Sequence, residues 1–71
     1  MSPEKLAHMA NQIATFFQSQ PHEDAVKGVA GHINDFWEPR MRAQLLAMLE
    51  GGKPALHAYV VEAAPLIRRP R

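Results

Sequence analysis

The side chains of this chain that could do chemistry are its histidines and a few hydroxyls, and they are scattered along the sequence. The histidines are His8, His22, His32 and His57. No histidine stands three or four residues from another, so no two would share a helix face as neighbouring metal ligands. A zinc site would need three or four ligands brought together from separate helices. The spacing therefore favours polar surface positions over a metal site.

The hydroxyl groups and the glycines give no catalytic or nucleotide-binding motif. Ser2, Thr15 and Ser19 do not stand in a local motif with a base and an orienting acid, which a hydrolase needs. Gly28 and Gly31 lie inside a helical pattern, whereas a phosphate loop lies between a strand and a helix. We predict that this chain contains no catalytic residue, no cofactor-binding residue and no metal ligand.

The length and composition of the chain limit it to one small domain with a thin core. A chain of 71 residues buries only about 60% of the surface that its unfolded form exposes. Eleven residues are alanines, which contribute little apolar area to a core. Such a domain is marginally stable, and a stabilising partner is expected. The absence of cysteine argues against a disulfide-rich secreted domain and fits a reducing compartment.

Charge and hydropathy exclude two classes of partner. The formal net charge is +1, which is too small for a protein that neutralises many phosphates, so we expect no nucleic-acid partner. The sequence contains neither a signal-peptide pattern nor an apolar run of the roughly 20 residues that cross a membrane. We therefore expect a soluble, cytoplasmic protein that has no membrane partner.

Prolines and glycines mark the ends of about four short helices. The prolines that precede amphipathic runs are Pro3, Pro21, Pro39 and Pro54. Proline is favoured in the first turn of a helix because its missing N–H would be unpaired there. Ser2 can cap the first helix, and Gly51 with Gly52 can end the third. The sequence predicts an all-α fold, with the last two helices at about residues 39–50 and 54–64.

The first two helices carry the same apolar pattern at an offset of twenty residues. The matching positions are Leu6, Met9, Ala10, Ile13, Phe16 and Phe17, and then Val26, Val29, Ala30, Ile33, Phe36 and Trp37. Each set lies on one face of a helix, and the small residue in the middle lets two helices approach closely. The pattern predicts that the first two helices form an antiparallel hairpin, with Phe17 and Trp37 in its core.

Two apolar residues and the C-terminal segment do not belong to the apolar faces of the predicted helices. Leu46 and Val61 lie off the apolar arcs of the third and fourth helices, so each is either an ordinary exposed residue or a partner contact. The segment 65–71 contains two prolines and three arginines. We predict a single helical domain over residues 1–64, followed by a flexible basic tail over residues 65–71.

Three residues on the helices are candidates for close contact with a partner. Gly28 and Gly31 each cost about 1 kcal/mol relative to alanine inside a helix. They either admit the close approach of another chain or are tolerated on a solvent face. Asn11 lies on a side stripe of small and amide-bearing residues, where it either contacts a partner or is solvated.

Two arginines and a tryptophan complete the predicted partner-binding set. Arg40 and Arg42 lie in the first turn of the third helix, where the helix dipole disfavours cations by roughly 0.3–1 kcal/mol. They either pair internally with Asp35 and Glu38 or meet carboxylates of a partner. Arginine and tryptophan are enriched at interface hot spots, so Trp37 is an alternative anchor for a partner.

Three stretches of the sequence carry a resemblance to a known family. They are MANQIATFF at residues 9–17, PHEDAVKGVAGHI at residues 21–33 and FWEPRMR at residues 36–42. Over about residues 5–49 the chain resembles the delta subunit of bacterial NAD-dependent formate dehydrogenases. The final third is much less distinctive.

The resemblance implies a function that the residues alone do not. It implies a non-catalytic accessory subunit that binds the alpha subunit and acts in assembly or stability of a cytoplasmic complex. Other subunits of that complex would carry the molybdenum or tungsten pterin, iron–sulfur clusters, flavin and the NAD site, and would interconvert formate and carbon dioxide. The alternative is an independent helical regulatory module that self-associates, or binds a protein partner or a small effector.

Overall fold

The chain folds into a small bundle of helices. The computed structural model describes residues 1–52 and 55–70. Its elements in chain order are α1 (Pro3–Phe17), α2 (His22–Phe36), α3 (Pro39–Gly51), α4 (Ala58–Ala63) and a 3₁₀ turn, η1 (Ala64–Leu66). Within the described residues there is no strand, and no helix has the length and apolar character needed to cross a membrane. The predicted all-α fold of about four short helices is confirmed.

The predicted helix ends are correct for α1 and α3. The Ser2 hydroxyl accepts a hydrogen bond from the Lys5 amide at 3.2 Å and so satisfies one of the free N–H groups of the first turn. Pro3 and Pro39 open their helices. Gly52 ends α3 with φ of +72°, a left-handed conformation that favours glycine.

The start of α4 was predicted wrongly. The helix begins at Ala58, and residues 55–57 before it are not helical, while Pro54 lies outside the described residues. His57 sets the start instead: its Nδ1 accepts a hydrogen bond from the Tyr59 amide at 3.0 Å. The His57 amide in turn donates to Oδ1 of Asn11 on α1 at 2.8 Å. A contact with another helix therefore determines where α4 begins.

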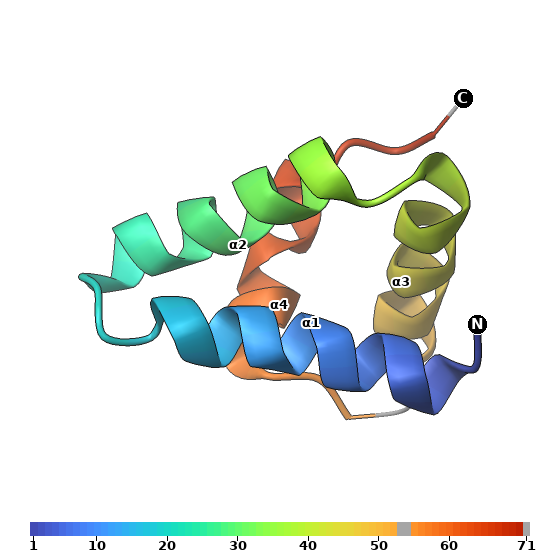
Figure 1. Cartoon of the computed structure of the whole chain (residues 1–71), viewed down its shortest axis with the longest axis horizontal. Helices are drawn as coiled ribbons and strands as arrows, with labels where there is room; N and C mark the ends of the chain where they lie inside the picture. Colours follow the sequence, from blue (N-terminus) through green and yellow to red (C-terminus); the bar gives the residue numbers. More distant parts are fainter. Residues whose placement is uncertain (53–54, 71) are drawn as a thin grey trace.

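The helices are arranged around an antiparallel hairpin, as the sequence predicted. In Figure 1, α1 and α2 run in opposite directions, α3 lies beyond the open end of the hairpin, and α4 lies behind it. The most extensive contacts between elements are those of α2 with α4 and of α1 with α2. The hairpin is therefore covered by α4 and closed at one end by α3.

The core lies where the hairpin meets α3 and α4. The largest fully buried side chains are Leu6, Val29, Ile33, Leu45 and Val60. Fully buried alanines on α1, α2 and α4 let these short helices approach closely. Leu46 is also buried, so it is neither an ordinary exposed residue nor a free partner contact, whereas Val61 is exposed. Leu46 belongs to the same core cluster as Ile67 of the C-terminal segment, and a helical wheel of α3 alone cannot show such an association.

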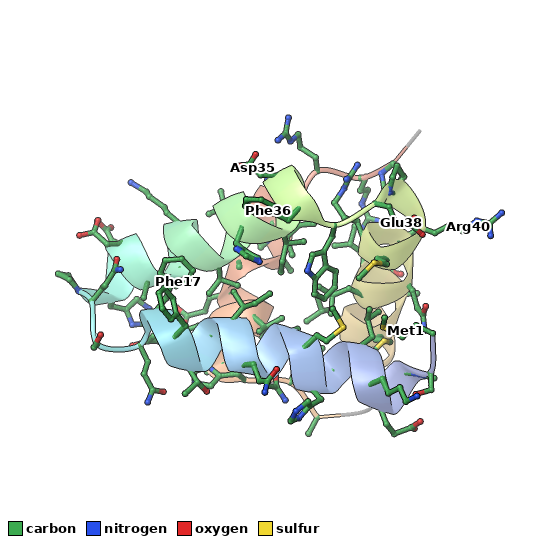
Figure 2. The ribbon with its side chains drawn as sticks, in the orientation of Figure 1. Met1, Phe17, Asp35, Phe36, Glu38 and Arg40 are labelled. Carbon is green, nitrogen blue, oxygen red and sulfur yellow. The ribbon has the colours of Figure 1, made fainter. Side chains whose placement is uncertain are left out.

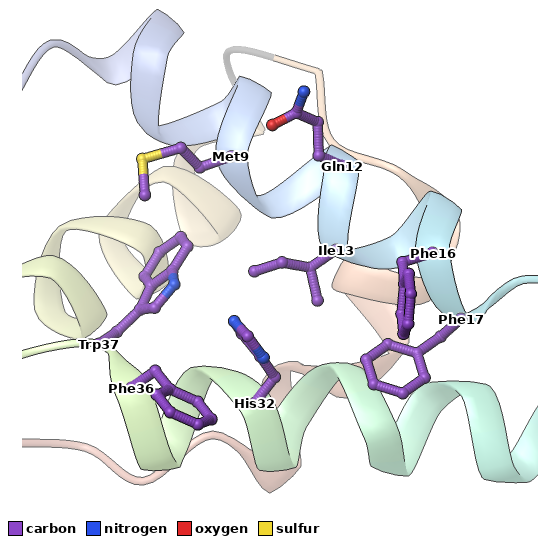
Figure 3. A pocket seen from close by; sticks show the side chains of 8 residues that line it. All are labelled: Met9, Gln12, Ile13, Phe16, Phe17, His32, Phe36 and Trp37. Atoms are coloured by element: carbon purple, nitrogen blue, oxygen red, sulfur yellow. The ribbon is translucent and has the colours of Figure 1, made fainter.

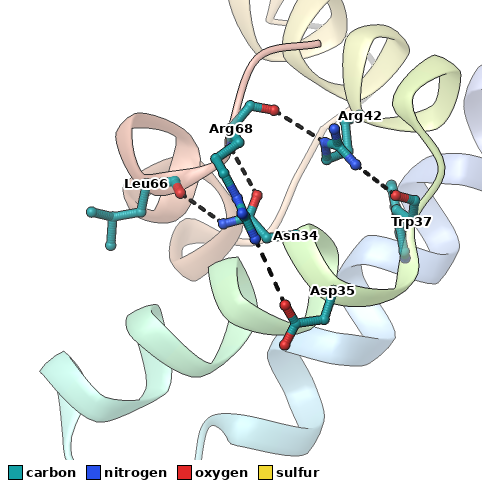
Figure 4. Close-up of polar contacts among 6 residues, drawn as sticks. All are labelled: Asn34, Asp35, Trp37, Arg42, Leu66 and Arg68. Carbon is teal, nitrogen blue, oxygen red and sulfur yellow. Dashed lines mark hydrogen bonds and ion pairs between the residues drawn. The ribbon is translucent and has the colours of Figure 1, made fainter.

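The C-terminal segment differs from the predicted flexible tail. Ile67 is only 4% exposed and belongs to the core. The Asn34 side chain on α2 holds the backbone on both sides of it: Nδ2 donates to the Leu66 carbonyl at 3.0 Å, and Oδ1 accepts from the Arg68 amide at 2.8 Å (Figure 4). Ile67 follows one other apolar residue, Leu66, and precedes two arginines, and so short an apolar run has neither a helix nor a strand period that would predict its burial. Arg71 lies outside the described residues.

Candidate functional site

An apolar groove lies between α1 and α2. It has a volume of about 560 Å³ and is lined by Met9, Gln12, Ile13, Phe16, Phe17, His32, Phe36 and Trp37. Figure 3 shows Phe17 and Trp37 at opposite ends of this groove, with Ile13 and His32 between them. Because the helices are antiparallel, the C-terminal end of each helix brings one aromatic pair to one end of the groove.

The most exposed large apolar side chains of the groove are Phe16 and Phe36. Both are 75% exposed, although the sequence pattern placed them on the apolar faces. Successive residues of a helix point about 100° apart, so Phe16 and Phe17 at the end of α1 cannot both face the core. Trp37 follows the last residue of α2 in an extended backbone conformation, so its side chain takes a different direction from that of Phe36. Trp37 is buried in the core, Phe17 is half-buried and packs against it, and Phe16 and Phe36 remain outside.

Stacking holds the two exposed rings beside the groove. The Phe16 ring meets the Phe17 ring edge to face, with centroids 5.2 Å apart, and the Phe36 ring lies 4.8 Å from that of His32. Exposed apolar surface that is gathered in one place is typical of sites that bind other proteins. The groove is therefore the candidate functional site.

Gly28 lies against the Phe17 ring within the hairpin. A β-carbon at Gly28 would lie 2.6 Å from Cδ1 and Cε1 of Phe17, so the close neighbour of this glycine is a ring of the same chain. At Gly31, a β-carbon would meet nothing within 4 Å in the described structure. The two glycines that the sequence grouped together therefore have different surroundings, and Gly31 alone faces open space.

Asn11 and Trp37 also have internal roles. Oδ1 of Asn11 accepts the His57 amide hydrogen bond at the start of α4. Trp37 is only 5% exposed, as predicted for a core residue, so it is not an exposed anchor, although its side chain also lines the groove. Both residues hold elements of this chain together.

The two arginines are placed differently from each other. Nη1 of Arg42 donates to the Trp37 carbonyl at 2.8 Å, and its Nε donates to the Arg68 carbonyl at 3.1 Å (Figure 4). Arg42 is thus internal, but it bonds to carbonyl oxygens rather than to the expected carboxylates. One of those carboxylates, Asp35, lies 3.7 Å from Nη2 of Arg68 instead.

Arg40 differs from Arg42 because it points away from the molecule. Figure 2 shows its side chain extending from the start of α3 into solvent. No hydrogen bond or ion pair joins it to another part of the described chain. Of the six predicted partner-binding residues, only Gly31 and Arg40 are therefore left without an internal contact that explains them.

The groove was missed because its residues were assigned to the core. Met9, Ile13 and Phe16 have the right period for a buried face, and Phe36 has the same position in the second helix. One signal was available. Two adjacent aromatic residues at the end of each helix indicate that one of them must be exposed.

The histidines do not gather into a metal site within the described parts of the chain. No three side chains of the histidine, cysteine, aspartate or glutamate types lie close enough there to hold an ion. Nε2 of His22 lies 2.7 Å from Oε1 of Glu62, which links the start of α2 to α4. The ring of His57 caps α4.

Comparison with protein-family models gives a match. No match was found among curated proteins. The model of one family, described as "NADH-dependant formate dehydrogenase delta subunit FdsD", matches residues 5–64. This range contains all the residues that line the groove and the whole of α2, α3 and α4. Because the match covers most of the 71 residues, the chain belongs to the FdsD family of NADH-dependent formate dehydrogenase delta subunits.

Proposed function

We propose that this chain is a non-catalytic accessory subunit of a cytoplasmic, bacterial NAD-dependent formate dehydrogenase complex. It acts in assembly or stability of the complex by binding the alpha subunit through the groove between α1 and α2. The observation that carries this proposal is the exposure of Phe16 and Phe36 inside the range that matches the family. In this proposal the molybdenum or tungsten pterin, the iron–sulfur clusters, the flavin and the NAD site belong to the partner subunits.

The energetics of the groove favour a stabilising contact. A phenylalanine that passes from exposed to buried removes apolar area worth about 25 cal/mol per Å², which amounts to roughly 2 kcal/mol for each ring. Phe16 and Phe36 are both available for this burial. A partner that binds only the folded chain also raises its stability by mass action. A small domain with an alanine-rich core would gain the most from such a partner.

Binding is tested by co-purification with the alpha subunit. We expect Phe16→Ala and Phe36→Ala each to weaken association, and the double variant to lose most of it, while circular dichroism still shows a folded helical protein. Leu66→Ala is the matched control, because Leu66 is also a large exposed apolar residue but lies outside the groove. Wild-type recovery of the alpha subunit by the double variant would contradict binding through the groove.

The role in the complex is tested by producing the formate dehydrogenase with and without this chain. We expect less assembled complex, or a shorter half-life of formate-dependent NAD reduction, when the chain is absent. Supplying the double Phe16→Ala, Phe36→Ala variant should not restore either quantity. Equal yield and half-life in all three preparations would contradict a role in assembly or stability.

A further inference from the structure

The groove contains one ionisable group. Among its lining residues Gln12, His32 and the indole N–H of Trp37 are the polar groups, and only His32 can carry a charge. Figure 3 shows the His32 ring projecting from α2 into the groove, where it lies beside Phe36. No hydrogen bond joins this ring to another group of the described chain, and the residue is half-buried. A protein that covers the groove would therefore take the His32 ring out of water.

The apolar lining determines which backbone conformation the occupant can have. An extended peptide would place its backbone N–H and C=O groups over side chains that offer almost no hydrogen-bond partners. Buried backbone groups need such partners, and the described chain has no strand edge to supply them. A helix pairs its own backbone groups, so it can lie on an apolar surface without this cost. The groove therefore suits a helix.

The dimensions of the hairpin agree with a helical occupant. α1 and α2 have 15 residues each, which corresponds to about 22 Å at a rise of 1.5 Å per residue. Side chains of a third helix can pack between the ridges of two neighbouring helices along this length. Apolar residues at every third or fourth position of the occupant would meet the exposed rings of Phe16 and Phe36.

Burial of His32 places a further requirement on the occupant. A polar group that is buried without a partner weakens binding, so the occupant should offer an acceptor to the ring N–H. A carboxylate can accept this hydrogen bond whether the ring is neutral or protonated, and it forms a charge-assisted bond with the protonated ring. Charge complementarity with the one ionisable group of the groove thus favours an acidic side chain.

We propose that the groove receives an apolar α-helix of the partner subunit, and that this helix places one aspartate or glutamate carboxylate against His32. This inference rests on the proposed function, in which the groove binds the alpha subunit. The exposed phenylalanines supply the apolar contact, and His32 selects a helix that carries an acidic residue among its apolar ones.

Two substitutions of His32 give opposite results for an acidic and for a purely apolar occupant. The dissociation constant for the purified alpha subunit is measured for wild type, His32→Leu and His32→Lys. With a carboxylate present, we expect His32→Leu to bind about tenfold more weakly, because the carboxylate loses its partner. His32→Lys should bind more tightly than His32→Leu, because the lysine supplies a positively charged donor for the carboxylate. Tighter binding by His32→Leu than by wild type, or weaker binding by His32→Lys than by His32→Leu, would overturn the proposal.

Cross-linking tests whether the occupant is a helix. A photo-reactive amino acid at Gln12, on the α1 side of the groove, marks the residues of the alpha subunit that lie against it. We expect the marked residues to be three or four positions apart and to lie near an acidic residue. Cross-links to alternate residues, as in an extended segment, would overturn the helical occupant.

The outcomes separate this inference from the proposed function. Failure of the wild-type chain to bind the alpha subunit contradicts the proposed function. If binding depends on Phe16 and Phe36 but the dissociation constants of the His32 variants follow the order that overturns the proposal, only the carboxylate against His32 is contradicted.

Discussion

The ring of Phe17 on α1 lies across the backbone of α2 at Gly28. A β-carbon at position 28 would come within 2.6 Å of two ring atoms, closer than β-carbons approach other atoms in proteins. The absence of a side chain at Gly28 therefore lets the ring pack against the second helix at the turn end of the hairpin (Figure 2). The aromatic end of α1 and a glycine of α2 are two parts of one contact.

Gly28→Ala should destabilise the protein. The new methyl group must displace the Phe17 ring, and overpacking costs about 1–3 kcal/mol, which exceeds the gain of roughly 0.5–1 kcal/mol in helix propensity. Gly31→Ala is the matched control and should stabilise by about 0.5–1 kcal/mol, because open space surrounds that position. Urea unfolding measures both. A gain in stability for Gly28→Ala equal to that for Gly31→Ala would show that the ring moves aside freely.

Trp37→Ala should remove most of the stability of the fold, because this side chain is buried. Truncating a buried tryptophan costs about 3–5 kcal/mol, which is a large part of the stability of so small a domain. The adjacent exposed Phe36→Ala should change stability by only about 0.5 kcal/mol. Thermal unfolding followed by circular dichroism compares the two. Similar losses of stability for Trp37→Ala and Phe36→Ala would contradict the burial of Trp37 beside an exposed Phe36.

Arg42→Gln should destabilise the protein more than Arg40→Gln does. Arg42 donates to two carbonyls that join the end of α2 to the C-terminal segment, and hydrogen bonds from charged groups contribute about 1.5–3 kcal/mol each at most. We expect a net loss of about 1–2 kcal/mol, since one of the two bonds is exposed. Arg40→Gln should raise stability by roughly 0.3 kcal/mol, because it removes a cation from the first turn of α3.

The two arginine variants also separate folding from binding. Association with the alpha subunit, expressed per folded molecule, should be unchanged for Arg42→Gln. If Arg42→Gln loses association while its stability is unchanged, Arg42 contacts the partner, as the sequence suggested.

Ile67→Ala should cost about 2–4 kcal/mol, because the side chain is buried in the core. Leu66→Ala should have little effect, because Leu66 is 49% exposed. Limited proteolysis after the arginines of residues 65–70 compares the same two variants. The rate of cleavage should rise for Ile67→Ala. If both variants behave like wild type, residues 65–70 are frayed in solution, as the composition of this segment indicated.

His57→Ala should lower stability by about 0.5–2 kcal/mol, the usual cost of losing a helix cap. His57→Asn should recover most of this loss, because asparagine is a good helix cap. The hydrogen bond from the backbone N–H of residue 57 to Oδ1 of Asn11 does not involve the side chain at position 57, so the substitution keeps it. Chemical unfolding gives the two values. Equal losses for both variants would show that the ring of His57 contributes by packing rather than by capping.

Most of the fold could be predicted from local features. Ser2 and Gly52 mark helix ends through their own chemistry, and Leu6, Ala10 and Ile33 mark the buried faces through helical spacing. These signals depend only on residues a few positions apart. The hairpin followed because two matching apolar faces joined by a short turn bury each other.

The candidate site could be predicted only in part. Phe16 and Phe17 both fit the apolar period, and nothing in the sequence distinguishes the ring that packs on Gly28 from the ring that stays exposed. Asn11 and Arg42 were correctly recognised as unusual, but their partners, His57 and the Arg68 carbonyl, are 46 and 26 residues away. An internal partner at such a distance looks the same in the sequence as a partner on another chain.

The sequence by itself determined the helices, their apolar faces, the antiparallel hairpin and the resemblance to the delta subunit family, because each depends on residue type and short-range spacing. Only the tertiary structure decided where α4 begins, that Ile67 joins the core, and that Phe16 and Phe36 border an open groove. The physical reason is that burial is a property of the space between elements. The packing of Phe17 on Gly28 and of the C-terminal segment on Asn34 fills some of that space and leaves the groove unfilled.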